Sequence, residues 1–184
     1  MSLARTLGPL LAGDVRDDPY TRHLYASDAS MYAIEPLAVA FPRHADDVQA
    51  LVAACGELGV PVLPRGAGTS LAGQTVGAAV IVDFSRHMNR ILEIDGRTAR
   101  VQPGVVQDQL NRAARKHGLM FGPDTSTSNR ATIGGMIGNN SAGSHSVLYG
   151  STIDHVEALR VVLADATTPT WPPTPGCGRR WTRC

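Results

Sequence analysis

The chain has 184 residues, of which 43% are hydrophobic, and a formal net charge of +1. This length allows a buried core and predicts one domain, and the interspersed charges provide no basic stripe for nucleic acid and no polybasic patch for a membrane surface. Residues 1–11 contain no long apolar run of the kind that forms a secretory signal or a membrane span, so we expect a cytosolic protein.

The first half of the chain predicts strands on either side of a helix. After an arm over residues 1–35 that is helical and then irregular, a strand is expected at 37–41, a helix at 46–58 and a second strand at 60–63. Cys55 lies in the helical pattern and is expected to be a buried thiol. The three cysteines are too few and too scattered for a disulfide framework or a tetrahedral metal site, so we expect no metal.

The second half continues with a strand at 78–84 and a hairpin over 91–101, whose centre is an Asp-Gly pair. A helix is expected at 105–117, and residues 153–164 form an apolar, strand-like pattern that charges interrupt. Because the strands alternate with helices at first and then pair as a hairpin, the chain predicts an α+β domain with a mixed sheet, not a doubly wound one.

A glycine-rich loop at residues 65–74 follows the strand at 60–63 and suits a phosphate. Glycine has no Cβ, so successive backbone N–H groups can converge on an anion. The dinucleotide fingerprint GxGxxG fails because Leu71 stands at the last glycine position, and the Walker A pattern fails because Gln74 replaces its lysine. An ordinary flexible loop is the alternative interpretation.

A second cluster of glycines and hydroxyls occupies residues 123–143, about sixty residues further on. Two such loops imply an elongated ligand, and FAD, with a diphosphate between two ring systems, has that shape. The alternative is a mobile polar loop, but Ile133, Met136 and Ile137 give this segment apolar anchors that a disordered linker lacks.

Together these segments resemble one family, the FAD-linked oxidases and dehydrogenases with a vanillyl-alcohol-oxidase-like or PCMH-type flavin domain. The resemblance is greatest to the branch that contains glycolate oxidase and D-lactate dehydrogenase. It covers residues 36–165, and the run at 143–150 is similar to members fused to an iron–sulfur domain. The motifs that carry it are at residues 64–70, 101–105, 123–126, 132–135, 140–143 and 149–150.

The resemblance implies a PCMH-type fold and a set of residues that bind FAD. These are Arg65, Gly66, Ala67, Gly68, Thr69, Ser70, Gln74, Pro123, Asp124, Ser126, Thr127, Thr132, Gly134, Gly135, Asn140, Ser141 and Gly143. Some relatives attach the flavin through a histidine in the first loop. Thr69 and Ser70 stand in that loop here, so we expect non-covalent FAD.

Three side chains have competing interpretations. Arg65 is expected beside the diphosphate, where charge-assisted hydrogen bonds strengthen binding. Asp124 either contacts the cofactor or fixes its loop, or it forms an Asx turn after Pro123. His145 is an attachment or catalytic residue, or else a solvated or packing histidine.

The resemblance also indicates what is missing. Relatives continue into a domain that binds the substrate. Here the resemblance to the family ends near residue 166, and the tail that follows does not match it. We therefore expect an arm at 1–35, an incomplete FAD-binding domain at 36–166 and a disordered tail at 167–184. The implied function is the flavin domain of an enzyme that oxidises a small 2-hydroxy acid, truncated and with no catalytic residue assigned. A non-catalytic nucleotide-binding or interaction module is the alternative.

Overall fold

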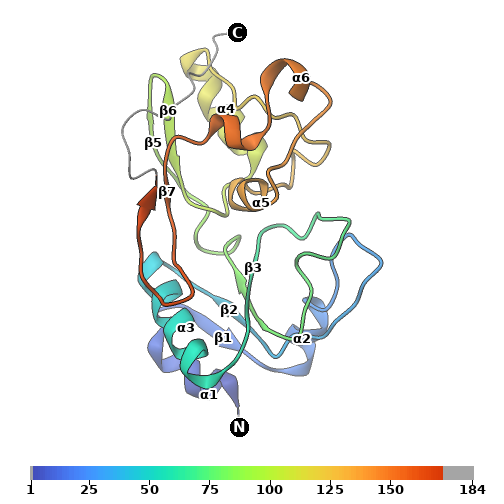
Figure 1. Cartoon of the computed structure of the whole chain (residues 1–184), viewed down its shortest axis with the longest axis vertical. Coiled ribbons are helices and arrows are strands. Elements are labelled where there is room, and N and C mark those ends of the chain that lie inside the picture. The colour runs from blue at the N-terminus through green and yellow to red at the C-terminus, as the bar shows by residue number, and fades with distance from the viewer. Residues whose placement is uncertain (1, 172–184) are drawn as a thin grey trace. The chain divides into compact units, whose positions relative to one another are not determined.

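A computed structural model describes residues 2–171, and the chain forms two compact units (Figure 1). Of the described residues, the first unit contains 2–88 and 161–169, and the second contains 89–160 and 170–171. The expected tail at 167–184 lies, from residue 172, outside the described residues.

The first unit is built on a four-stranded sheet in the order β1-β2-β4-β3. Its strands are β1 (Asp14–Arg16), β2 (Ala38–Phe41), β3 (Val62–Arg65) and β4 (Val80–Asp83). Strand β4 pairs in parallel with β2 and β3, whereas β1 is antiparallel to β2. The predicted mixed α+β architecture is therefore confirmed.

Alternation along the strands gives the sheet two apolar faces. Ala38, Ala40, Val80 and Val82 pack on one face against helices α1 (Leu3–Leu7) and α3 (Ala45–Leu58) (Figure 1). Cys55 of α3 is fully buried there, as predicted, and burial raises the pKa of its thiol. The other face is formed by the alternate strand residues Val39, Phe41 and Ile81.

The amino-terminal arm contains more regular structure than its composition predicts. The short helical turn η1 (Gly8–Leu10) follows α1, and α2 (Pro19–Leu24) begins where Asp18 caps its first turn. Strand β1 was not expected, because three residues with two charges carry no alternating pattern. Residues 14–16 are extended because they pair with β2 and form the edge strand of the sheet.

The second unit begins with the predicted hairpin of β5 (Ile91–Asp95) and β6 (Thr98–Val101). Helix α4 (Gln107–Ala114) and η2 (Arg115–His117) follow and end at Gly118, as expected for this segment. Two short helices, α5 (Ile133–Gly138) and α6 (Ser146–Tyr149), were not predicted within the glycine-rich segment. Helix α5 forms there because Ile133 and Met136, one helical turn apart, are buried in the core of this unit.

The prediction of strand over residues 153–164 is confirmed only at its centre. Residues Thr152–His155 form the turn η3, and within the predicted range only β7 (Leu159–Arg160) is a strand. The Asp154 carboxylate accepts a hydrogen bond from the Ser151 backbone N–H (2.9 Å), which favours a helical turn. Strand β7 pairs with β8 (Thr170–Trp171), so regular pairing reaches past the boundary expected at residue 166.

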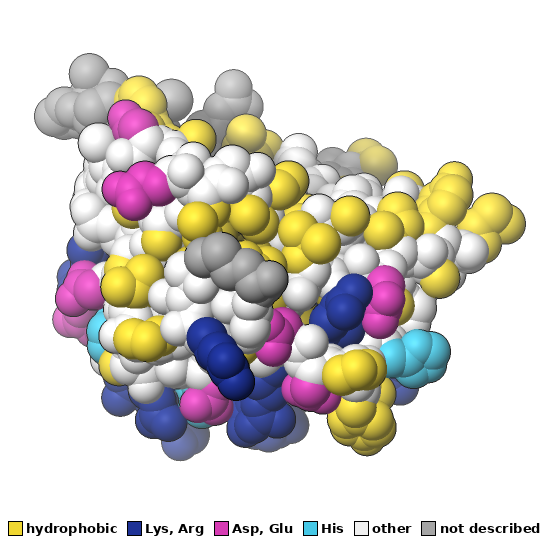
Figure 2. Space-filling model, turned by 90° about the horizontal axis from the view of Figure 1, so that it is seen from below, with side chains coloured by type: hydrophobic (Ala, Val, Ile, Leu, Met, Phe, Trp, Pro, Cys, Tyr) yellow, Lys and Arg dark blue, Asp and Glu magenta, His cyan; other side chains and the backbone are white. Residues whose placement is uncertain are grey.

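Charged side chains of both signs are interspersed on the face shown in Figure 2. None of the helices in residues 2–171 is long and apolar enough to cross a membrane.

Candidate functional site

The glycine loop, residues 65–74, leaves the carboxyl end of edge strand β3 in the first unit. Within residues 2–171, the five consecutive backbone N–H groups of residues 66–70 donate to no protein acceptor. Unpaired backbone donors are retained where water or a ligand satisfies them. Consecutive free N–H groups are a property of loops that bind anions. The loop therefore fits the diphosphate that its composition predicts.

The Arg65 side chain packs against the backbone of this loop at Gly68. Its guanidinium donates to the backbone carbonyls of Tyr25 (3.2 Å), Ser27 (2.8 Å) and Thr75 (3.3 Å). Gly68 has a φ of +65°, and a Cβ built on it would lie 2.7 Å from an Arg65 nitrogen. Glycine is favoured at this position because its backbone conformation is left-handed, and a side chain here would also have to displace the end of Arg65.

The segment that begins the second cluster, residues 123–127, is anchored in the second unit by a residue that the sequence analysis missed. The Gln107 side chain is 1% exposed. Its amide nitrogen donates to the carbonyl of Pro123, and its amide oxygen accepts from the Thr125 hydroxyl (2.7 Å). A signal for it exists, since Gln107, Leu110 and Ala114 share the buried face of α4. A polar residue on such a face needs a buried partner.

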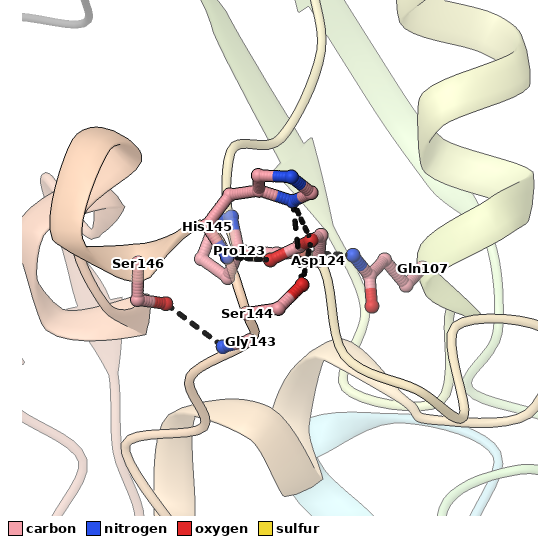
Figure 3. A network of polar contacts seen from close by, with 7 residues as sticks. All are labelled: Gln107, Pro123, Asp124, Gly143, Ser144, His145 and Ser146. Carbon is pink, nitrogen blue, oxygen red and sulfur yellow. Dashed lines mark hydrogen bonds and ion pairs between the residues drawn. The ribbon is translucent and has the colours of Figure 1, made fainter.

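The Asp124 carboxylate connects this segment to residues 143–146 (Figure 3). It accepts from the Ser144 hydroxyl (3.0 Å) and the His145 backbone N–H (3.1 Å), and it pairs with the His145 ring at Nδ1. The hydrogen bond from the His145 side chain is the largest cause that lowers the pKa of Asp124 to about 2. These contacts support the interpretation in which Asp124 fixes its loop, and His145 is its partner.

Gly143 is glycine because Asp124 packs directly against it. A Cβ at residue 143 would overlap both the carboxylate and the backbone carbonyl of Asp124. The Gly143 backbone N–H donates to the Ser146 hydroxyl (2.8 Å), which continues the network drawn in Figure 3. The structure thus gives Gly143 a packing role within its own unit.

Several other predicted site residues also make contacts within the second unit. The Thr132 hydroxyl caps α5 by accepting from the Gly135 N–H (3.4 Å), and the Gly134 N–H donates to the Pro103 carbonyl (2.8 Å). The Asn140 side chain accepts from the Ile153 N–H (2.9 Å), and the Ser141 carbonyl accepts from Thr152. These hydrogen bonds fix the backbone of the second cluster from residue 132 on, and they do not involve the N–H groups of residues 124–127.

The donors that remain are again consecutive. Within residues 2–171, the backbone N–H groups of residues 124–127 donate to no protein acceptor. Ser126 is exposed and Thr127 half-buried in this stretch. Like the glycine loop, the second cluster fits a ligand with several hydrogen-bond acceptors, and such a ligand matches the oxygen- and nitrogen-rich FAD. The two loops belong to different units, the first to residues 1–88 and the second to residues 89–160.

Comparison with known families agrees with this geometry. Residues 36–170 match the family model described as FAD binding domain. The chain belongs to this family. Its cofactor is accordingly FAD, and the family match extends over the glycine loop, the second cluster and strand β7.

Proteins with curated names give the same picture. The chain is 48% identical over 156 residues to D-2-hydroxyglutarate dehydrogenase of Pseudomonas putida, which covers 82% of this chain and 16% of that protein. It is 43% identical to a glycolate oxidase subunit of Bacillus subtilis, with 78% and 32% covered. A mitochondrial D-lactate dehydrogenase of Kluyveromyces lactis is 33% identical, with 72% and 24% covered.

A solved alkyldihydroxyacetonephosphate synthase has the same fold, with a TM-score of 0.79 at 23% identity, and the match covers 92% of this chain and 34% of that one. The chain thus spans between a sixth and a third of the length of the relatives it matches.

Proposed function

We propose that this chain is the FAD-binding part of an oxidoreductase that oxidises a 2-hydroxy acid. The observation that supports the substrate class is the set of relatives, whose names specify D-2-hydroxyglutarate, glycolate and D-lactate. All three are small acids with a hydroxyl group on the carbon next to the carboxylate. The compound to be tested first is D-2-hydroxyglutarate, since the relatives named for it have the higher identities.

We further propose that FAD binds without a covalent bond, through the backbone donors of both loops. The free N–H groups of residues 66–70 bind the diphosphate, and those of residues 124–127 bind the flavin-proximal part. The proposed contact residues include those predicted from the sequence around these donors, among them Thr69, Ser70 and Gln74. Their hydroxyl and amide groups add donors without adding charge.

The chemistry divides between cofactor and protein. When bound, FAD would supply the hydride acceptor for oxidation of the C2 hydroxyl group, which also gives up a proton, to a 2-oxo group. The residues of this chain bind and orient the cofactor. We assign no residue of this chain as the base for the hydroxyl proton.

The first experiment is reconstitution of the chain with FAD, followed by absorbance and fluorescence. We expect a flavin spectrum that survives gel filtration and a flavin that acid precipitation releases into the supernatant. Flavin that stays with the precipitate would show a covalent bond. Riboflavin, which lacks the diphosphate, is the matched control and is expected to bind more weakly. No flavin retained from FAD would exclude the proposed function.

The substrate class is tested on the reconstituted chain by anaerobic addition of D- and L-2-hydroxy acids, with dithionite as the positive control. Bleaching by a D-2-hydroxy acid would support the full proposal. Bleaching by dithionite alone would limit the function to FAD binding, as the interaction-module alternative requires. An iron–sulfur domain or subunit as a partner, and a cytoplasmic location, also belong to this proposal.

A further inference from the structure

A short segment that precedes the family match holds the glycine loop. Residues 25–33, the arm loop, form a narrow turn closed by a bridge between Ser27 and Ala33 and a hydrogen bond from the Ile34 N–H to the Ala26 carbonyl (2.8 Å). The family match begins only at residue 36. The arm loop and the glycine loop both belong to the first unit.

Tyr25 anchors the arm loop to the sheet. Its ring packs against the apolar face formed by Val39, Phe41 and Ile81, and its hydroxyl donates to the Asp83 carboxylate at the end of β4. Burial, followed by the bond to Asp83, raises the pKa of Tyr25, so the hydroxyl remains a donor. The arm loop therefore starts from a fixed point in the core.

Arg65 connects this fixed point to the glycine loop. Three of its hydrogen bonds go to backbone carbonyls, those of Tyr25 and Ser27 in the arm loop and that of Thr75 directly after the glycine loop. The guanidinium also lies 5.2 Å from the centre of the Tyr25 ring. Hydrogen bonds from a charged donor are stronger than neutral ones. The guanidinium, which belongs to the first residue of the glycine loop, thus joins the arm loop to the residue that follows the glycine loop.

Three further contacts join the same segments along the loop. The Thr75 hydroxyl donates to the Asp28 carboxylate (2.9 Å), and the Ala29 N–H donates to the Gly68 carbonyl (2.9 Å). The Tyr32 ring lies against Gly73, where a Cβ would come within 2.7 Å of it. The glycine loop is therefore held at its start, middle and end by one segment, while the N–H groups of residues 66–70 bind no acceptor in the described part of the chain.

We propose that the arm loop is a brace that fixes the glycine loop in its donor-exposing shape before FAD binds, and that Arg65 is a positioning residue rather than a phosphate ligand. The part that concerns FAD rests on the proposed function. Gly68 lies close to two Arg65 nitrogens, since its Cβ would be 2.7 Å from one and 3.3 Å from the other. The guanidinium thus packs against the loop backbone at Gly68, and its hydrogen bonds go to protein carbonyls. A loop ordered in advance binds its ligand more tightly, because less entropy is lost on binding.

The experiment measures loop order and FAD affinity separately in the full chain. Amide order parameters of residues 66–70 are measured by NMR without FAD, and dissociation constants for FAD are measured by flavin fluorescence. In the wild-type chain we expect order parameters near the rigid range of about 0.85, and in Arg65→Ala below about 0.6. The dissociation constant should rise at least about tenfold in Arg65→Ala. Arg22→Ala is the matched control, because Arg22 contacts Glu35 and Pro36 instead of the glycine loop.

A milder pair of variants keeps the test decisive if Arg65→Ala does not fold. Thr75→Val conserves shape but removes the hydroxyl that reaches Asp28, and Thr75→Ser retains it. We expect lower order parameters and about fivefold weaker FAD binding in Thr75→Val, with both restored in Thr75→Ser. Asp28→Ala removes the same bond together with the one from the Ser30 N–H (2.8 Å), so its effect should be at least as large. Adding Thr75→Val to Asp28→Ala should change little, because the bond between the two side chains is already lost.

The outcomes separate the two proposals. Weaker FAD binding in Arg65→Ala with unchanged order parameters would make Arg65 a direct ligand and overturn the brace. Unchanged order parameters in Thr75→Val and Asp28→Ala would also overturn it. A wild-type chain that binds no FAD would remove the proposed function, while the order parameters would still decide whether the arm loop orders the glycine loop.

Discussion

The glycine loop and the second cluster have similar compositions but are held by opposite charges. In the glycine loop the Arg65 guanidinium donates to carbonyls of the surrounding backbone. In the second cluster the Asp124 carboxylate accepts from Ser144 and His145. Both arrangements leave consecutive backbone N–H groups free within residues 2–171. Two loops of similar sequence thus both keep free N–H groups, although different side chains hold them. A cationic side chain can donate to backbone carbonyls, and a carboxylate can accept from backbone N–H groups.

The two loops also differ in what surrounds their glycines. A Cβ at residue 143 would meet the backbone of Asp124, whereas the three atoms nearest to a Cβ at residue 68 would all belong to the end of the Arg65 side chain. Backbone cannot move without displacing its neighbours, but a long side chain can adopt another rotamer. This difference predicts unequal effects of the same substitution.

The largest effect is expected for Gly143→Ala. The new methyl group overlaps the Asp124 backbone, so the free energy of unfolding should fall by about 3 kcal/mol, at the upper end for overpacking. Urea denaturation measures it. The matched control is Gly138→Ala at the end of α5, where a Cβ meets nothing within 4 Å, and which should be neutral or slightly stabilising. Equal effects of the two substitutions would show that the segment around residue 143 relaxes.

The next effect in size is expected for Gln107→Leu. This variant leaves the Pro123 carbonyl and the Thr125 hydroxyl without their buried partner, which should lower the free energy of unfolding by about 2 kcal/mol. Gln109→Leu on the exposed side of the same helix is the control and should lose less than about 1 kcal/mol. If the two variants had the same midpoint of unfolding in denaturant, Gln107 would not anchor the second cluster.

A smaller loss is expected for Gly68→Ala in the glycine loop. The left-handed conformation of residue 68, with φ of +65°, costs about 1–2 kcal/mol for alanine, and the Arg65 side chain can move aside. Denaturation under the conditions used for Gly143→Ala gives the comparison directly. If the free energy of unfolding fell as much as in Gly143→Ala, the Arg65 side chain would be unable to move away from the new methyl group.

The smallest effect is a dependence on acid pH in the second cluster. Because the pKa of Asp124 is lowered to about 2 in the folded chain, from 3.8, the unfolded state binds more protons between these values. The stability that Asp124 contributes is present above pH 3.8 and is lost as the pH falls through about 2. Asp124→Asn should therefore differ from the wild-type chain near neutral pH and converge with it at the acid end of this range. Parallel urea midpoints over this range would contradict the assignment.

Much of the fold was predictable from local patterns. The strands at 37–41 and 78–84, the helix at 46–58 and the hairpin around Asp95 and Gly96 all follow from periodicity and turn chemistry. Helix α5 and strand β1 were missed, because Ile133 and Met136 are stabilised by distant core residues and β1 by its pairing with β2. Residues 153–158 carried a strand-like apolar pattern, but local hydrogen bonds turned the first of them into η3.

Residue patterns along the chain were enough to specify the family and therefore the cofactor, because glycine and hydroxyl residues at these spacings allow loops with consecutive free backbone donors. How each loop is supported depends on the folded structure. Arg65 reaches carbonyls forty residues earlier in the chain, and Gln107 and His145 reach the segment at 123–125 from sixteen or more residues away. Contacts of that separation leave no periodic signal in the chain, because they depend on which surfaces the packing of the sheet and helices brings together.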